Sequence, residues 1–128
     1  RKTAAGRNIV MALAAADRRV EVLKNCEWKE GPHLQEKRWA CELVAVKGND
    51  LVVVGGCCRR EGKLIRKSTA EKITRKGTHQ SFAKMLKERA FFAAKTTDKA
   101  IYVVGGISEA TADCFPLEKE EWRFLFEM

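Results

Sequence analysis

Two adjacent cysteines are the side chains in this chain that are best placed for chemistry. Cys57 and Cys58 are followed directly by Arg59 and Arg60. Nearby cations lower the pKa of a thiol and favour the thiolate, which is the nucleophilic form, so this spacing would suit a reactive or redox-sensing cysteine. The simpler interpretation, which we prefer, is that both are ordinary cysteines at the end of a strand.

Metal binding and the common catalytic motifs find little support in the sequence. The spacing of His33 and His79 fits no ligand pattern of the usual zinc sites. The chain contains no G-x-S-x-G elbow, P-loop, H-E-x-x-H or paired-carboxylate motif. The sequence therefore predicts a protein that is not an enzyme, with no catalytic residue, no metal site and no cofactor.

A run of basic residues follows the cysteines. Residues 59–76 contain eight basic and two acidic residues, so this stretch carries a charge of +6 within a total of +8. Such a patch attracts acidic partners, and it lacks the interleaved aromatic residues that a platform for single-stranded nucleic acid needs. We therefore expect an acidic segment of a protein partner rather than nucleic acid. The predicted contacts are Arg59, Arg60, Lys63, Ser108 and Glu109.

The elements that must position these residues recur along the chain. The segment 51–56 (LVVVGG) returns as 101–106 (IYVVGG), each an apolar run of strand length that ends on two glycines. An arginine precedes each glycine pair, with Arg38 lying 17 residues before Gly55 and Arg89 lying 16 before Gly105. The residue four positions before each arginine is apolar, Leu34 and Met85. Six positions before those lie Trp28 and His79. The same six-residue spacing separates Trp122 from Met128.

This frame resembles the Kelch repeat. The residues that carry the resemblance are Trp28, Arg38, Gly55, Gly56, Arg89, Tyr102, Gly105, Gly106 and Trp122. In that family each repeat forms one four-stranded blade of a β-propeller. The resemblance implies an all-β fold, an incomplete Kelch-type propeller of antiparallel blades. Its units would be a partial blade at 1–36, a second at 37–87 that is degenerate after 57, and a third at 88–128.

The resemblance also implies a function. Kelch propellers bind protein partners through loops on one face, and in many animal proteins they bring substrates to a cullin-type ubiquitin ligase, whereas others bind actin. The arginines of the frame would then have a structural role, and the tryptophans would fill the space between adjacent blades. The implied function is a non-catalytic protein-binding module.

Local patterns predict the strands of each unit. The segments 43–46 and 51–54 read as a hairpin joined by Lys47-Gly48-Asn49-Asp50. The corresponding hairpin would join 90–94 to Ile101 through a turn at 95–99. In the first unit, 9–13 and 20–23 would be strands, with three alanines at 14–16 in place of the glycine pair. The third strand of the second unit is hard to find, and 63–65 is the best candidate.

A rival architecture remains open. Apolar residues fall at helical spacing in two segments, 9–23 and 82–93. Helices there would give a small basic α+β domain, for which nucleic-acid binding would be the natural function. Salt dependence would separate the two functions, because binding to phosphates weakens steeply with salt.

Composition bounds the cellular setting. Five cysteines, an odd number without C-x-x-C spacing, predict reduced thiols and a cytoplasmic protein. No signal peptide and no apolar run of membrane-spanning length is present in the sequence. The 128 residues are too few for a closed ring of blades. We read the chain as a segment of a larger protein, and we expect open sheet edges that invite self-association.

Overall fold

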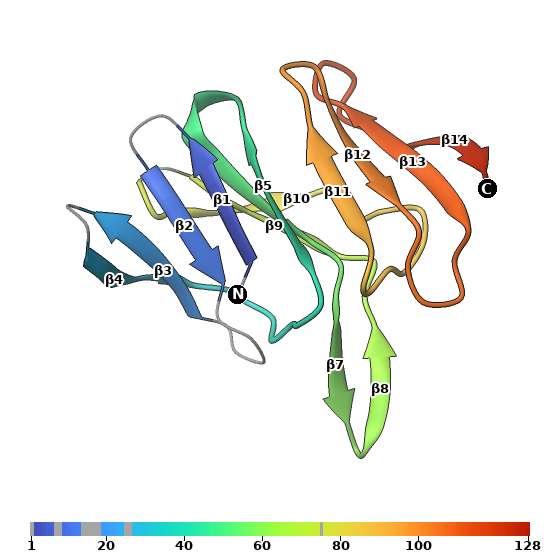
Figure 1. The fold of residues 1–128 in the computed structure, drawn as a ribbon, viewed down its shortest axis with the longest axis horizontal. Coiled ribbons are helices and arrows are strands. Elements are labelled where there is room, and N and C mark those ends of the chain that lie inside the picture. Colours follow the sequence, from blue (N-terminus) through green and yellow to red (C-terminus); the bar gives the residue numbers. More distant parts are fainter. Residues whose placement is uncertain (1, 7–8, 14–18, 25–26, 75) are drawn as a thin grey trace.

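The fold is all-β and consists mainly of three four-stranded antiparallel sheets (Figure 1). A computed structural model describes the backbone of all residues except 1, 7–8, 14–18, 25–26 and 75, and side chains are described from residue 33 onward except at 49 and 75. The described residues contain no α-helix, only a 3₁₀ turn at Lys47–Asn49. The predicted helices over 9–23 and 82–93 are therefore wrong.

The strands follow one order in each sheet. The first sheet contains β1 (Lys2–Gly6), β2 (Ile9–Leu13), β3 (Arg19–Lys24) and β4 (Glu27–His33). The second contains β5 (Glu42–Val46), β6 (Asp50–Val54), β9 (Ala70–Ile73) and β10 (His79–Phe82). The third contains β11 (Ala93–Thr96), β12 (Ala100–Val104), β13 (Thr111–Pro116) and β14 (Arg123–Glu127). The first strands β1, β5 and β11 lie side by side, and the others follow outward in chain order (Figure 1).

A separate hairpin interrupts the second sheet between its second and third strands. It is formed by β7 (Cys57–Arg60) and β8 (Lys63–Arg66), and it projects away from the three sheets (Figure 1). The prediction that 63–65 is the third strand of the second sheet is therefore wrong, since β9 takes that place. Periodicity could not separate the two short segments, because both have strand length and mixed polarity.

The central hairpin of the second sheet follows from its turn. Gly48 has φ = 84°, a conformation that glycine adopts without strain, and it lets β5 and β6 pair from Glu42↔Val54 to Val46↔Asp50. The corresponding hairpin of the third sheet begins later than predicted, at Ala93 instead of Ala90, and its turn covers 97–99. The reason is that residues 89–92 form a loop whose carbonyl groups bond to neighbouring loops.

The core lies between the sheets. Along β6, Val52 and Val54 belong to a cluster that also contains Ile101 and Val103 of the third sheet. The alternate residues Leu51 and Val53 belong to a second cluster on the opposite face. A strand covered on both faces is apolar at every position rather than at alternate ones, which explains the unbroken valine run.

Among the described residues, none of the helical structure has the length and apolar character needed to cross a bilayer.

Candidate functional site

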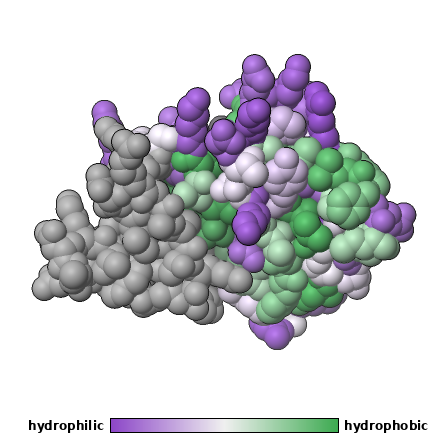
Figure 2. Space-filling view, turned by 45° about the horizontal axis from the view of Figure 1, so that its top comes forward, coloured by the Kyte–Doolittle hydropathy of each residue, from purple (hydrophilic) through white to green (hydrophobic). Residues whose placement is uncertain are grey.

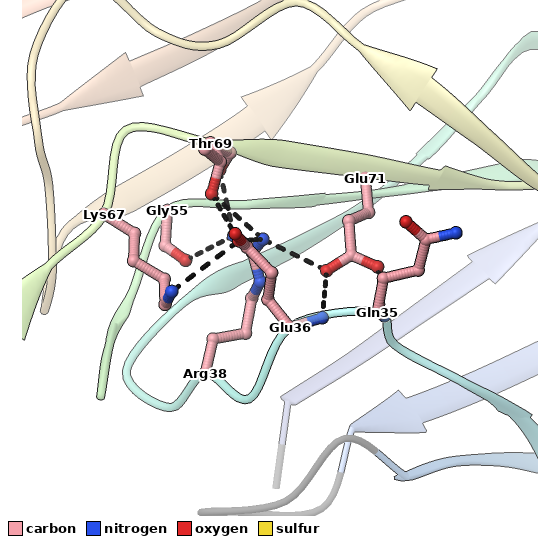
Figure 3. Close-up of polar contacts among 7 residues, drawn as sticks. All are labelled: Gln35, Glu36, Arg38, Gly55, Lys67, Thr69 and Glu71. Carbon is pink, nitrogen blue, oxygen red and sulfur yellow. Dashed lines mark hydrogen bonds and ion pairs between the residues drawn. The ribbon is translucent and has the colours of Figure 1, made fainter. Parts of the chain in front are cut away.

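A buried arginine organises the end of the second sheet. Arg38 has no exposed surface, and its Nη1 donates to the carbonyl oxygens of Gly55 (2.8 Å) and Thr69 (2.9 Å). Its Nη2 donates to carboxylate oxygens of Glu36 (2.7 Å) and Glu71 (3.1 Å) (Figure 3). Charge-assisted hydrogen bonds of this kind are the strong ones in proteins. The side chain therefore holds the glycine loop against β9 and is not available to a ligand.

The third sheet repeats this arrangement. Arg89, also without exposed surface, donates from Nη1 to the carbonyl oxygens of Gly105 (2.7 Å) and Thr111 (2.8 Å) and from Nη2 to Asp113 Oδ2 (2.7 Å). The threonine lies 31 residues after Arg38 in the second sheet but only 22 after Arg89 in the third, a difference of nine. One residue of this difference lies before the glycine pair, and the β7–β8 hairpin accounts for the other eight. The threonine and the acid of each network were not predicted from the sequence, although both pairs have Thr-x-acid spacing.

The glycine pair of the second sheet is required by the close approach of the two arginine loops. A Cβ at Gly55 would lie 2.6 Å from the Arg89 carbonyl oxygen, and the Gly56 N–H donates to the same oxygen (2.7 Å). A Cβ at Gly56 would lie 2.7 Å from the carbonyl oxygen of Trp39. At Gly105, in contrast, the nearest atom would be 3.8 Å away. The glycines of the second sheet therefore accept the loop of the third, whereas Gly105 has no such neighbour among the described residues.

The aromatic positions of the frame have different surroundings. Trp122 is buried between the second and third sheets, where its Nε1 donates to the Ala83 carbonyl oxygen (2.9 Å). Tyr102 lies in β12 and is 37% exposed. Trp28 lies in β4, but its side chain is outside the described residues. The alanines at 14–16 are also outside them.

The predicted basic contacts lie on the projecting hairpin. Arg59, Arg60 and Lys63 are exposed, and none of the three side chains has a hydrogen bond or an ion pair in the described part of the chain. The loop between the strands has positive φ at both Glu61 (52°) and Gly62 (77°), as a type I′ turn requires. That turn matches the twist of paired strands and gives the cations a defined scaffold.

The hairpin is tied to the loop that carries the other two predicted contacts. Arg66 Nη1 donates to the Ile107 carbonyl oxygen (2.6 Å), next to Ser108, which is exposed. Glu109 follows, but its Oε1 accepts hydrogen bonds from the Thr111 hydroxyl (2.6 Å) and from Lys87 Nζ (3.3 Å). The structure thus places all five predicted contacts at one end of the molecule, with the Glu109 carboxylate already engaged.

The adjacent cysteines and the two histidines lie in strands. Burial raises the pKa of the Cys57 thiol, which opposes thiolate formation, and its Sγ lies 3.6 Å from the Trp39 carbonyl oxygen. Cys57 and Cys58 are the first two residues of β7, so they begin a strand and do not end one as predicted. His33 lies in β4 and not in a turn, and His79 lies in β10. In the part of the chain that the structure describes, no group of His, Cys, Asp and Glu side chains could hold a metal ion.

Two carboxylates at this end of the molecule have lowered pKa values. A hydrogen bond from the Thr69 hydroxyl holds the pKa of Glu36 below its usual value of 4.5, and Arg38 and Lys67 add to the effect against an opposing influence of burial. For Glu109 the main cause of the lower pKa is the hydrogen bond from Thr111. Both groups are therefore stabilised in the charged form by folding.

The stability of the fold should depend on these groups in acid. A pKa that is lower in the folded state contributes stability above the unfolded value and loses it as the pH falls through the folded value. We expect the free energy of unfolding to decline as the pH drops below about 4.5. The variant with both Glu36→Gln and Glu109→Gln should be less stable at neutral pH and should lose less stability in acid. Urea unfolding over a pH series measures both, and parallel curves for the two proteins would contradict the assignment.

Comparison with protein-family models finds no match to this chain, and comparison with curated protein sequences finds none either. Among solved structures, the chain is similar to the structure of YjhT, with a TM-score of 0.85 over 99% of this chain and a sequence identity of 13%. At this identity the likeness shows the fold alone. The chain spans about half the length of that protein, 51%.

Proposed function

We propose that the chain forms three successive blades of a Kelch-type β-propeller and acts as a non-catalytic protein-binding module. Three sheets with the same inner-to-outer strand order support the propeller, as does the repeated bonding of a buried arginine to a glycine carbonyl. Blades pack face to face around an axis. Such packing accounts for the clusters on both faces of the second sheet and for the approach of the Arg89 loop to the preceding glycine pair.

The uncovered face of the third sheet fits the same proposal. Tyr102 follows the repeat register of Val52, which has no exposed surface because the third sheet covers it, yet Tyr102 is 37% exposed. Phe126 of β14 pairs with Ala112, which pairs with Val104, so it lies on the same face as Tyr102, and it is 53% exposed. Apolar residues gather on the side of the molecule that carries the C-terminal sheet (Figure 2). In a propeller, this face would be covered by a following blade.

The β7–β8 hairpin is the observation that carries the binding role. The connection from the glycine pair to the threonine is eight residues longer in the second sheet than in the third, 14 against 6, and the exposed cations of the hairpin make no internal ion pair or hydrogen bond among the described residues. Ordering these residues has an entropic cost that little burial offsets. The hairpin is thus poorly explained by stability, and its uncommitted charge suits an acidic segment of a protein partner.

Charge reversal tests the proposal. The variant with Arg59→Glu and Arg60→Glu replaces two attractive charges by two repulsive ones, so its affinity for an acidic peptide should fall about tenfold or more at low salt. Fluorescence anisotropy with a labelled Glu-rich peptide measures this change. Lys99→Glu, an exposed charge in the β11–β12 turn, is the control. Unchanged affinity of the double variant would refute the proposed binding role.

A further inference from the structure

An exposed aromatic residue, Phe91, lies next to the hairpin, and its contribution to the stability of the fold is small. Phe91 is 58% exposed, and its backbone has φ = 54°. The equivalent residue of the preceding unit, also two positions after the buried arginine, is Ala40 with φ = 55°. This left-handed conformation costs about 1–2 kcal/mol for a residue with a Cβ. An exposed ring recovers little of that by burial, so the fold alone does not require phenylalanine here.

Trp39 fixes the orientation of this ring. The two ring centroids are 5.8 Å apart with an interplanar angle of 79°, an edge-to-face arrangement. The Phe91 N–H also donates to the Ala40 carbonyl oxygen (3.0 Å). Trp39 is bonded in turn to the base of the hairpin, because it and Cys57 exchange backbone hydrogen bonds of 2.9 and 2.8 Å. The exposed ring is therefore held in place beside β7, and little conformational entropy is lost when it binds.

Two aliphatic residues extend the apolar surface toward the cations. Ile107 is 39% exposed, its N–H donates to the Ala90 carbonyl oxygen (3.0 Å), and its own carbonyl oxygen accepts from Arg66. Leu64 is 41% exposed and lies two residues before Arg66 on β8, hence on the same face of the hairpin. Arg59, paired with Leu64, shares that face.

We propose that Phe91, Trp39, Ile107 and Leu64 form an apolar anchor site beside the cationic hairpin, and that its partner is a protein segment with an apolar side chain flanked by acidic residues. The inference rests on the proposed binding role and specifies the partner's chemistry. Aromatic residues and arginine are the types that dominate the energetics of protein interfaces. Charge complementarity selects the acidic flanks, because Arg59 and Arg60 have no anionic partner among the residues that the structure describes.

The same surface suits nucleic acid less well. A single-strand platform stacks successive bases on the open faces of aromatic rings. Here one ring edge meets the face of the other, and the remaining surface is aliphatic.

The test compares two Glu-rich peptides that differ only in a central leucine or serine, together with an oligonucleotide of similar charge. Phe91→Ala should weaken binding of the leucine peptide about tenfold and leave the serine peptide nearly unchanged. Phe91→Leu should retain most of the affinity for the leucine peptide. Phe124→Ala, an equally exposed phenylalanine on β14, is the matched control and should change neither. Unfolding curves for each variant establish that it folds.

The outcomes separate this inference from the proposed function. The anchor site would be overturned if the unaltered protein bound both peptides equally, or if Phe91→Ala weakened both equally. The binding role of the hairpin would still stand in that case, provided that charge reversal of Arg59 and Arg60 weakens binding. If charge reversal left the affinity for both peptides unchanged, the proposed function would be refuted. Tighter binding of the oligonucleotide, with a steep salt dependence, would overturn the protein partner.

Discussion

Replacing Arg89 by methionine should lower the free energy of unfolding by about 3–5 kcal/mol, a large part of the stability of an ordinary domain. Arg89 is fully buried, and its partner Asp113 is only 2% exposed. The substitution leaves the buried carboxylate and the Gly105 carbonyl group without this donor, whereas the Thr111 carbonyl group keeps its bond from the Gly105 N–H. Leaving one member of a buried ion pair unpaired costs far more than the net contribution of the intact pair. Urea unfolding monitored by circular dichroism measures the loss.

Three further variants make this prediction specific. Arg38→Met should cost less, because one of its carboxylate partners, Glu36, keeps a side-chain exposure of 40% and can be solvated. A double variant with Arg89→Met and Asp113→Leu should recover part of the loss, since it removes the orphaned charge. Arg60→Met, on the exposed hairpin, should change stability by less than about 0.5 kcal/mol. Similar losses for Arg89→Met and Arg60→Met would show that the buried network does not stabilise the fold.

Gly55→Ala should destabilise the chain by about 3 kcal/mol or more, whereas Gly105→Ala should cost about 1 kcal/mol. Both glycines have positive φ, 64° and 76°, so both substitutions carry the same backbone strain. They differ in their surroundings. A Cβ at Gly55 would lie 2.6 Å from the Arg89 carbonyl oxygen, a backbone atom that cannot move without shifting the third sheet, but a Cβ at Gly105 would meet nothing closer than 3.8 Å.

The pair of substitutions isolates packing between sheets from local conformation. Thermal and urea unfolding of the two variants give the difference directly. A third variant, Gly62→Ala, has φ = 77° and nothing within 4 Å, and it should resemble Gly105→Ala. If Gly55→Ala were no worse than Gly62→Ala, the close approach of the arginine loop would contribute nothing to stability.

Much of the secondary structure was predictable from local pattern. The turn at Lys47–Asn49 has glycine at its position of positive φ, and the valine run after it is apolar at every position, so the β5–β6 hairpin follows from neighbouring residues alone. The strand β9 could not be predicted in this way, because Ala70–Ile73 contains Glu71 and Lys72 and has no clear alternation of apolar and polar residues. Its place in the sheet is set by pairing with β6 and by the bond from Arg38 to Glu71.

The surface beside the hairpin shows the same division. The cations of the hairpin were visible as a run in the sequence. The aromatic and aliphatic residues beside them were not, since Trp39, Phe91 and Ile107 come from three separate loops. Only the arginine networks and the glycine contacts bring those loops together.

The order of residues by itself determined that this chain builds strands ending in paired glycines and places its positive charge after the first pair, because turn conformation and local charge depend on near neighbours. The tertiary structure decided that the two arginines are buried, that residues 57–66 form a projecting hairpin, and that Phe91 lies next to it. These features depend on contacts between residues more than fifteen positions apart, and local sequence preferences do not encode such contacts.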